Sequence, residues 1–186
     1  MKCLIVGLGN PGPEYELTRH NVGFRVADAL QALNKGTPFK LERYGWLSEY
    51  TQKGQSIYVL KPNTFMNLSG MAVRYWLQTL KLPKEQLLVV TDDLSISFGK
   101  LRIKPKGSGG GHNGLGSIET LLATTEYPRL RFGIGDDFTK GKQIDYVLGR
   151  FSANEEAELP LLIEKAVKGI EIFGGVGLEQ AMNVTN

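Results

Sequence analysis

Short apolar runs alternate along the chain with longer segments in which apolar residues recur at every third or fourth position. The short runs predict buried strands at residues 2–8, 57–60, 87–91 and 131–134. The longer segments predict helices with one apolar face, over residues 21–34, 69–80, 114–124 and 153–173. Ser152 and Glu155 form a capping box that opens the last helix, and Pro160 inside it predicts a kink or a break.

Strands that alternate with helices indicate an α/β fold with a largely parallel or mixed sheet. The length of 186 residues suits one domain, and the last ten or so residues are expected to form a loose tail. In such sheets ligands bind at the carboxyl ends of the strands, so polar residues that follow a strand or open a helix should meet at one edge. These residues are Asn10, Asn67, Asp92, Asp93, His112 and Asn113.

The composition is that of a soluble globular protein, which we expect in the cytoplasm. No apolar run approaches the roughly 18 residues of a membrane span, and the first residues do not resemble a signal peptide. The lone cysteine, Cys3, has no partner for an internal disulfide and excludes a cysteine-based zinc site. It is expected to be a small core residue on the first strand.

Cations are concentrated in one part of a chain whose net charge is only +3. No acidic residue lies between Asp93 and Glu119, and a strand over residues 100–106 would place its alternate side chains on one face. Such a row suits phosphate groups, although a solvated strand face would show the same pattern. The cations at every second position are Lys100, Arg102, Lys104 and Lys106, and Arg129 and Arg131 repeat the spacing.

The only two histidines each precede an asparagine and lie close to glycine, as His20-Asn21 and His112-Asn113. Two further segments, residues 7–12 and 66–70, also combine asparagine with glycine. Together these four segments could form a pocket lined by amides that holds a base, because histidine takes a proton near neutral pH. Four ordinary turns would use the same residue types, so both interpretations remain open.

Several familiar motifs fail in their context. Residues 7–12 match a dinucleotide fingerprint, but no helix starts within them and no acidic residue follows at the required distance. The glycines at 107–111 lack the ending of a P-loop, no serine lies in a nucleophile elbow, and two histidines at this spacing predict no metal site. A histidine acting on water is simpler: His20 as the base, with Asp92 either holding its ring or acting as a turn residue.

Three segments of the chain strongly resemble signatures of the bacterial-type peptidyl-tRNA hydrolase family. They are residues 6–23, which include the first glycine motif and His20, then residues 61–70, then residues 107–115. The resemblance runs from Met1 to about the final helix, with the order and spacing of the family. One departure follows the aspartate, where Ser95 and Ser97 replace an aspartate and a proline that are usual in the family.

The resemblance implies a single α/β/α domain whose twisted, mixed, largely parallel sheet is flanked by helices. It also implies a monomeric, cofactor-free and metal-independent enzyme that cleaves the ester between a peptide and the terminal ribose of tRNA. A noncatalytic RNA-binding relative of the intron-splicing type is the alternative. His20 matches the catalytic base, Asp92 its supporting carboxylate, and Asn10 the residue that distinguishes blocked from free aminoacyl groups. The remaining matches are Tyr15, Phe65, Met66, Asn67 and Asn113 around the peptide and CCA end, with Lys104 and Arg131 on acceptor-stem phosphates.

Overall fold

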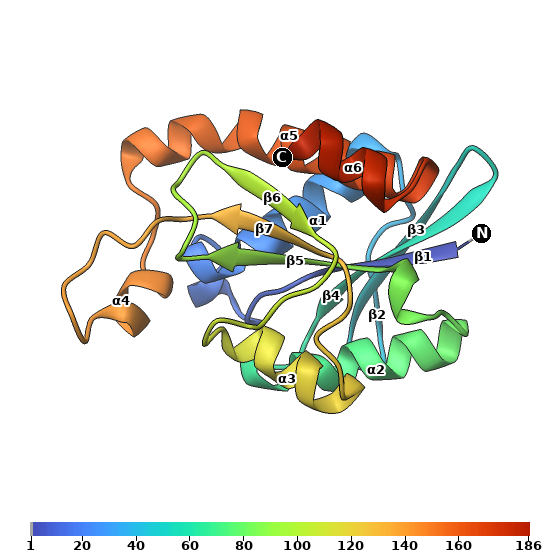
Figure 1. Ribbon diagram of the computed structural model, residues 1–186, viewed down its shortest axis with the longest axis horizontal. Helices are drawn as coiled ribbons and strands as arrows, with labels where there is room; N and C mark the ends of the chain where they lie inside the picture. Colours follow the sequence, from blue (N-terminus) through green and yellow to red (C-terminus); the bar gives the residue numbers. More distant parts are fainter. Residues whose placement is uncertain (1) are drawn as a thin grey trace.

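The computed structural model describes residues 2–186 as a single α/β domain, and Met1, with which the predicted domain begins, lies outside the described residues. Within that range one seven-stranded sheet has the order β2-β3-β4-β1-β5-β7-β6 (Figure 1). The neighbouring pairs β4–β1, β1–β5 and β5–β7 are parallel, and the outer pairs are antiparallel. The strands are β1 (Lys2–Gly7), β2 (Lys40–Glu42), β3 (Gly45–Gln52), β4 (Gln55–Pro62), β5 (Leu87–Asp93), β6 (Leu101–Lys104) and β7 (Arg129–Gly133).

Helices cover both faces of the sheet, as expected for an α/β/α domain (Figure 1). Helices α1, α5 and α6 contribute to one buried cluster, which contains Cys3, while α2 and α3 contribute to the other. A short helix, α4, lies beyond the carboxyl ends of β5 and β7. The helices are α1 (Val22–Leu33), α2 (Ser69–Leu80), α3 (Asn113–Leu122), α4 (Gln143–Val147), α5 (Ala153–Gly175) and α6 (Leu178–Thr185).

Strands β2 and β3 extend the sheet through two tight turns that the hydrophobic pattern did not predict. β3 and β4 are joined by Lys53 and Gly54, whose φ angles of 49° and 76° suit the two-residue hairpin between Gln52 and Gln55. β2 is exposed at all three positions, so it lacks the apolar run by which a strand is recognised. The strands and the four helices that the sequence predicted are present in the structure.

The structure corrects two predictions about the C-terminal third. Pro160 was predicted to mark a kink or a break, and it does not break α5, which continues as one helix of 23 residues. Packing of its buried stripe against the sheet outweighs a local cost of about 3 kcal/mol for an interior proline. The last residues are not a loose tail either: they form α6, which buries Ala181, and Asn186 donates to and accepts from the backbone of Ile103 on the edge strand β6.

The predicted row of cations is only partly correct. β6 covers residues 101–104 instead of 100–106, so Arg102 and Lys104 are the two cations on the strand. Arg129 is fully buried and lies 3.3 Å from Glu119, and Arg131 lies 3.2 Å from Asp93. The acidic residues on either side of the gap therefore neutralise two of the arginines. Among residues 2–186 no helix is long and apolar enough to cross a membrane.

Candidate active site

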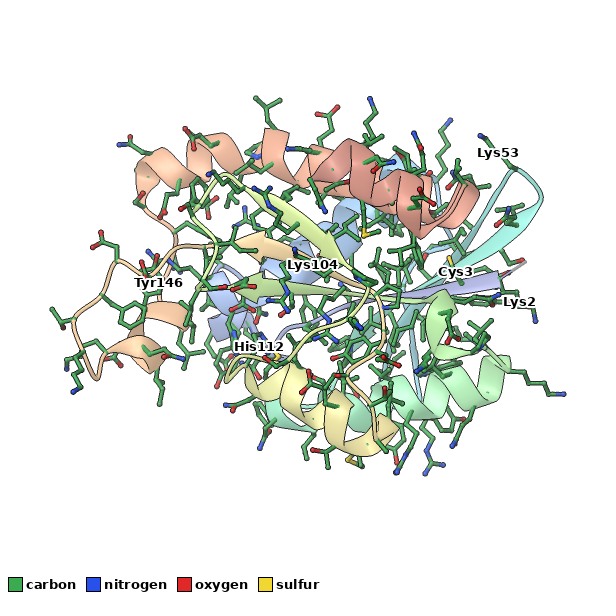
Figure 2. The ribbon with its side chains drawn as sticks, in the orientation of Figure 1. Lys2, Cys3, Lys53, Lys104, His112 and Tyr146 are labelled. Atoms are coloured by element: carbon green, nitrogen blue, oxygen red, sulfur yellow. The ribbon has the colours of Figure 1, made fainter. Side chains whose placement is uncertain are left out.

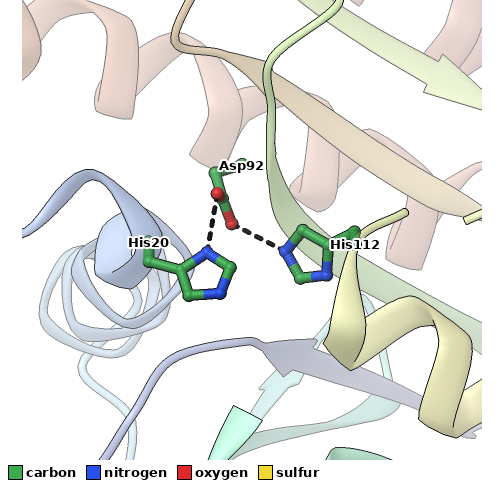
Figure 3. Close-up of side chains that lie close together, drawn as sticks. All are labelled: His20, Asp92 and His112. Carbon is green, nitrogen blue, oxygen red and sulfur yellow. Dashed lines mark hydrogen bonds and ion pairs between the residues drawn. The ribbon is translucent and has the colours of Figure 1, made fainter. Parts of the chain in front are cut away.

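The site is centred on a carboxylate that contacts both histidines of the chain (Figure 3). Asp92 Oδ2 lies 2.8 Å from His20 Nδ1, and its other oxygen, Oδ1, lies 2.8 Å from His112 Nε2. The ring centroids of the two histidines are 4.9 Å apart. We call these three residues the histidine–aspartate cluster. The structure thus places Asp92 on His20, as one of the two interpretations of this aspartate predicted.

Three elements converge to form the cluster. His20 lies on the 3-10 helix η2 (Arg19–Asn21), Asp92 lies near the end of β5, and His112 immediately precedes α3. Close approach of α1 to the sheet brings η2 to Asp92, and this approach requires a glycine at position 23. A Cβ there would lie 2.5 Å from the carbonyl oxygen of Leu8 and 2.7 Å from that of Val90.

Asp92 is ionised although its side chain is almost completely buried. Burial acts to raise the pKa of this carboxyl, but the charges and hydrogen bonds of His112 and His20 outweigh it and hold the pKa below its usual range. An ionised carboxylate can only accept hydrogen bonds, so the proton of the His20 ring is assigned to Nδ1. His20 Nε2 then has a free lone pair and can act as a base.

His20 and Asp92 lie in the wall of a cavity of about 410 Å³. Its other walls are the loop after β5, the glycines at 109–111 and helix α4, so it lies at the carboxyl edge of the sheet as predicted. Arg19 attaches α4 to η2, because its guanidinium donates to the carbonyl of Tyr146 and stacks 3.9 Å from that ring. Figure 2 shows Tyr146 on α4 and His112 at the start of α3.

Three hydrogen bonds hold Asn10, which is not among the residues that line this cavity. Its backbone N–H donates to Asn21 Oδ1 and its carbonyl accepts from Asn21 Nδ2, both at 2.9 Å. Its side-chain oxygen accepts from the backbone N–H of Met66 at 2.7 Å. The bond from Met66 engages the side-chain oxygen of Asn10, and its Nδ2 has no hydrogen-bond partner within residues 2–186. Asn10 lines a second cavity of about 560 Å³, together with Phe24 and Lys61.

The other residues predicted to hold substrate differ in exposure: some lie on the surface, and one is buried in the core. Phe65 is 55% exposed and its ring meets that of Tyr15 edge-on at 6.4 Å, which makes an aromatic surface. Asn67 is exposed on the 3-10 helix η3 (Met66–Leu68), and Asn113 is exposed where α3 faces the cavity that His20 lines. Met66 is buried in the core beneath α3, where it supports the site and is not among the residues that line either cavity.

The two predicted phosphate ligands also differ in their surroundings. Lys104 is exposed on β6 and has no ion-pair partner within residues 2–186 (Figure 2). Arg131 lies in the wall of the cavity that His20 lines, where it pairs with Asp93 and donates to the carbonyl of Ser108 in the glycine loop. Asp93 also accepts from the backbone and hydroxyl of Ser95, so the departure from the family pattern forms an ordered turn and leaves Asp92 in place.

The sequence identified His112 but assigned it no role. Its position explains why: His112 is the cap of α3, and the helical pattern around it does not reveal which neighbouring strand its ring reaches. Its Nδ1 accepts from the backbone N–H groups of Gly114 and Leu115 while its Nε2 reaches Asp92. In the sequence, the only indication of this contact was that Asp92 ends a predicted strand at the same edge of the sheet as His112.

The histidine–aspartate cluster also has the composition of a metal site, which the spacing of the histidines did not predict. One ligand atom from each residue lies within 4.8 Å of the others. However, each histidine lies 2.8 Å from a different oxygen of Asp92, the separation of a hydrogen bond. Ligands of one tetrahedral zinc ion would lie about 3.3 Å apart, given bonds near 2.0 Å. The contacts are therefore those of a hydrogen-bonded cluster.

Comparison with known proteins identifies the family of this chain. The family model described as peptidyl-tRNA hydrolase matches residues 4–186. A peptidyl-tRNA hydrolase of Porphyromonas gingivalis is 53% identical over 186 residues, covering 100% of both chains. One of Cytophaga hutchinsonii is 52% identical over 186 residues, covering 100% of this chain and 98% of the relative. The crystal structure of peptidyl-tRNA hydrolase from Acinetobacter baumannii has a TM-score of 0.93 at 34% identity, covering 99% of this chain and 94% of that one.

The fold and these matches define an enzyme of the hydrolase class. The chain belongs to the peptidyl-tRNA hydrolase family. The resemblance noted in the sequence and the predicted α/β fold are thereby confirmed.

Proposed function

We propose that this protein hydrolyses the ester that joins a peptide, or an N-blocked amino acid, to the terminal ribose of tRNA, and so recycles tRNA from prematurely released peptidyl-tRNA. Membership of the family supports this proposal, and so does the name shared by relatives that match the whole chain. The observation that carries it is the 2.8 Å contact between His20 and Asp92 at the wall of a cavity. It supplies a base where an ester can reach it.

In the proposed reaction His20 Nε2 takes a proton from a water molecule as the oxygen attacks the ester carbonyl carbon. The carbonyl electrons move to its oxygen and form a tetrahedral intermediate, which then expels the ribose oxygen. The imidazolium returns its proton to that leaving oxygen, so the histidine ends neutral. Asp92 stabilises the imidazolium during the cycle because its negative charge lies 2.8 Å away. Amides of Asn10 and Asn113 position the water and the peptide carbonyl.

The same site accounts for recognition of the two ends of the substrate. The exposed aromatic pair of Tyr15 and Phe65, together with Asn67, holds the peptide and the CCA end. Lys104 and Arg131 contact phosphates of the acceptor stem, which is sequence-independent binding. The proposed enzyme acts in the cytoplasm as a monomer without cofactor or metal.

A direct assay distinguishes this function from that of a noncatalytic RNA binder. Purified protein is incubated with N-acetyl-aminoacyl-tRNA, and loss of the ester is followed by release of the labelled amino acid. We expect release with turnover, and we expect unblocked aminoacyl-tRNA to be cleaved far more slowly because Asn10 reads the blocked group. Binding of intact substrate without any release would support the RNA-binding alternative instead.

A further inference from the structure

His112 is held by two elements at once, which makes it more than a helix cap. Its Nδ1 accepts from the N–H groups of Gly114 and Leu115 at 3.1 and 3.2 Å, which caps α3. Its Nε2 contacts Asp92 Oδ1 at 2.8 Å and Thr91 Oγ1 at 3.0 Å. A nitrogen that accepts from backbone N–H groups bears no proton, so the ring proton lies on Nε2 and points at the carboxylate.

The ring has little freedom to adopt another arrangement. Its side chain is 10% exposed, and that of Asp92 only 2%. A Cβ on Gly114 would lie 3.0 Å from His112 Cε1 and 2.7 Å from the sulfur of Met66, so this glycine allows the ring to pack against the start of α3. Protonation of Nδ1 would remove both cap bonds and place a positive charge at a helix N-terminus, where it is unfavourable. These contacts keep the Nε2–H of His112 on Asp92.

We propose that His112 is a positioning residue of the proposed ester hydrolysis: it holds Asp92 in the rotamer and charge state that orient His20. Asp92 has two oxygens and gives one to each histidine, so its carboxylate is shared. Without His112 its Oδ1 would remain buried with no ring donor, and the carboxylate could turn away from His20. The inference rests on the proposed function, because it assigns His112 a part in that reaction.

Sharing the carboxylate also fixes its direction, because Asp92 cannot rotate without breaking the contact of one oxygen with a histidine ring. The other charged groups around the cavity are Asp93, Arg131 and Asp136. Asp93 and Arg131 neutralise one another, Asp136 is exposed, and the adjacent Arg19 is bound to Tyr146 and Glu155, so none of them changes when His112 is replaced.

Two substitutions separate the two contacts of the ring. His112→Asn places an amide oxygen near the position of Nδ1, and asparagine is a favoured cap, but its side chain is too short to reach Asp92. His112→Gln places an amide N–H near the position of Nε2 and gives up the cap. We expect His112→Asn to keep the melting temperature within a few degrees and to lower kcat by about 10- to 100-fold with little change in KM.

His112→Gln should show the opposite pattern: a lowered melting temperature, with most of the lost kcat recovered. A folded His112→Asn variant with wild-type kcat would overturn the proposal, as would a folded His112→Gln variant that is as slow as His112→Asn. Imidazole ¹⁵N NMR gives a readout that does not depend on catalysis. We expect the neutral ring of His112 to carry its proton on Nε2 in the wild-type protein, and the Nδ1–H tautomer would contradict the inference. Wild-type protein that shows these NMR features but cleaves no ester would refute the proposed function instead.

Discussion

Asn21 holds Asn10 through both of its backbone polar groups, with two hydrogen bonds of 2.9 Å. The side-chain amide of Asn21 thus pairs with the N–H and the carbonyl of Asn10 as the backbone of a neighbouring strand would. Asn21 is 1% exposed and directly follows His20, so the same short helix positions the proposed base and the proposed selector of blocked substrates. The asparagine beside the histidine in the sequence therefore has a structural task that no spacing rule predicts.

Replacement of Asn21 should affect both stability and selectivity. Asn21→Ala leaves the N–H and the carbonyl of Asn10 buried without partners, which we expect to lower the free energy of unfolding by about 2–4 kcal/mol. The loosened Asn10 should also reduce the preference for N-acetyl-aminoacyl-tRNA over the unblocked form. Urea denaturation and paired kinetic assays measure the two effects. Unchanged stability together with unchanged preference would show that the two bonds do not hold Asn10.

Asp92→Asn should inactivate the enzyme while preserving its shape. His112 must donate from Nε2, so the new amide has to turn its oxygen towards His112 and its NH₂ group towards His20. Nδ1 of His20 then has to accept, its proton moves to Nε2, and the base is lost. We expect a fall in kcat of about 10³–10⁴-fold. Circular dichroism tests the fold, and a folded variant within tenfold of wild-type kcat would contradict the assignment of Asp92.

The phosphate contacts should be separable from the chemistry. Lys104→Ala removes an exposed cation without an ion-pair partner in residues 2–186, so it should weaken binding of tRNA and reduce the salt dependence of that binding. Arg131→Ala should do the same, and it also releases Asp93. Cleavage of a peptide esterified to a short CCA fragment should change little. Equal losses on both substrates would show that these residues do not act on acceptor-stem phosphates.

Metal chelation should leave the rate unchanged. The distances in the histidine–aspartate cluster are those of hydrogen bonds, and the proposed base requires the contact between His20 and Asp92. The rate of ester cleavage is measured before and after treatment with EDTA and removal of the chelator. Loss of activity that one divalent ion restores would instead identify the cluster as a metal site.

The strands and helices with a clear apolar period could be predicted from the sequence, and those without one could not. The exposed strand β2 lacks such a period, and α6 spans only eight residues, too few for its period to stand out. α6 packs on α5, and Asn186 binds the edge of β6. The continuous helix around Pro160 is likewise a result of packing against the sheet, which a local rule does not include.

The candidate site was predicted as a set of residue types, while its internal contacts needed the structure. The sequence placed Asp92 and His112 at one edge and made Asp92 a candidate partner of His20, but only the structure shows that Asp92 contacts both histidines together. For two arginines, the sequence missed ion-pair partners that the structure reveals. Arg129 and Arg131 looked unpaired along the chain, yet their partners Glu119 and Asp93 lie on neighbouring elements. Pairing across elements is not encoded in linear spacing.

The most direct test of the account compares wild-type protein with His20→Ala on intact N-acetyl-aminoacyl-tRNA, with binding and cleavage measured on the same preparations. The substitution removes the proposed base but leaves Asn10, Lys104 and Arg131. We expect cleavage to fall by about 10²–10⁴-fold, as for loss of a general base. Affinity should stay within a few-fold, because phosphate contacts supply most of it. A folded His20→Ala variant that cleaves at the wild-type rate would contradict the central claim.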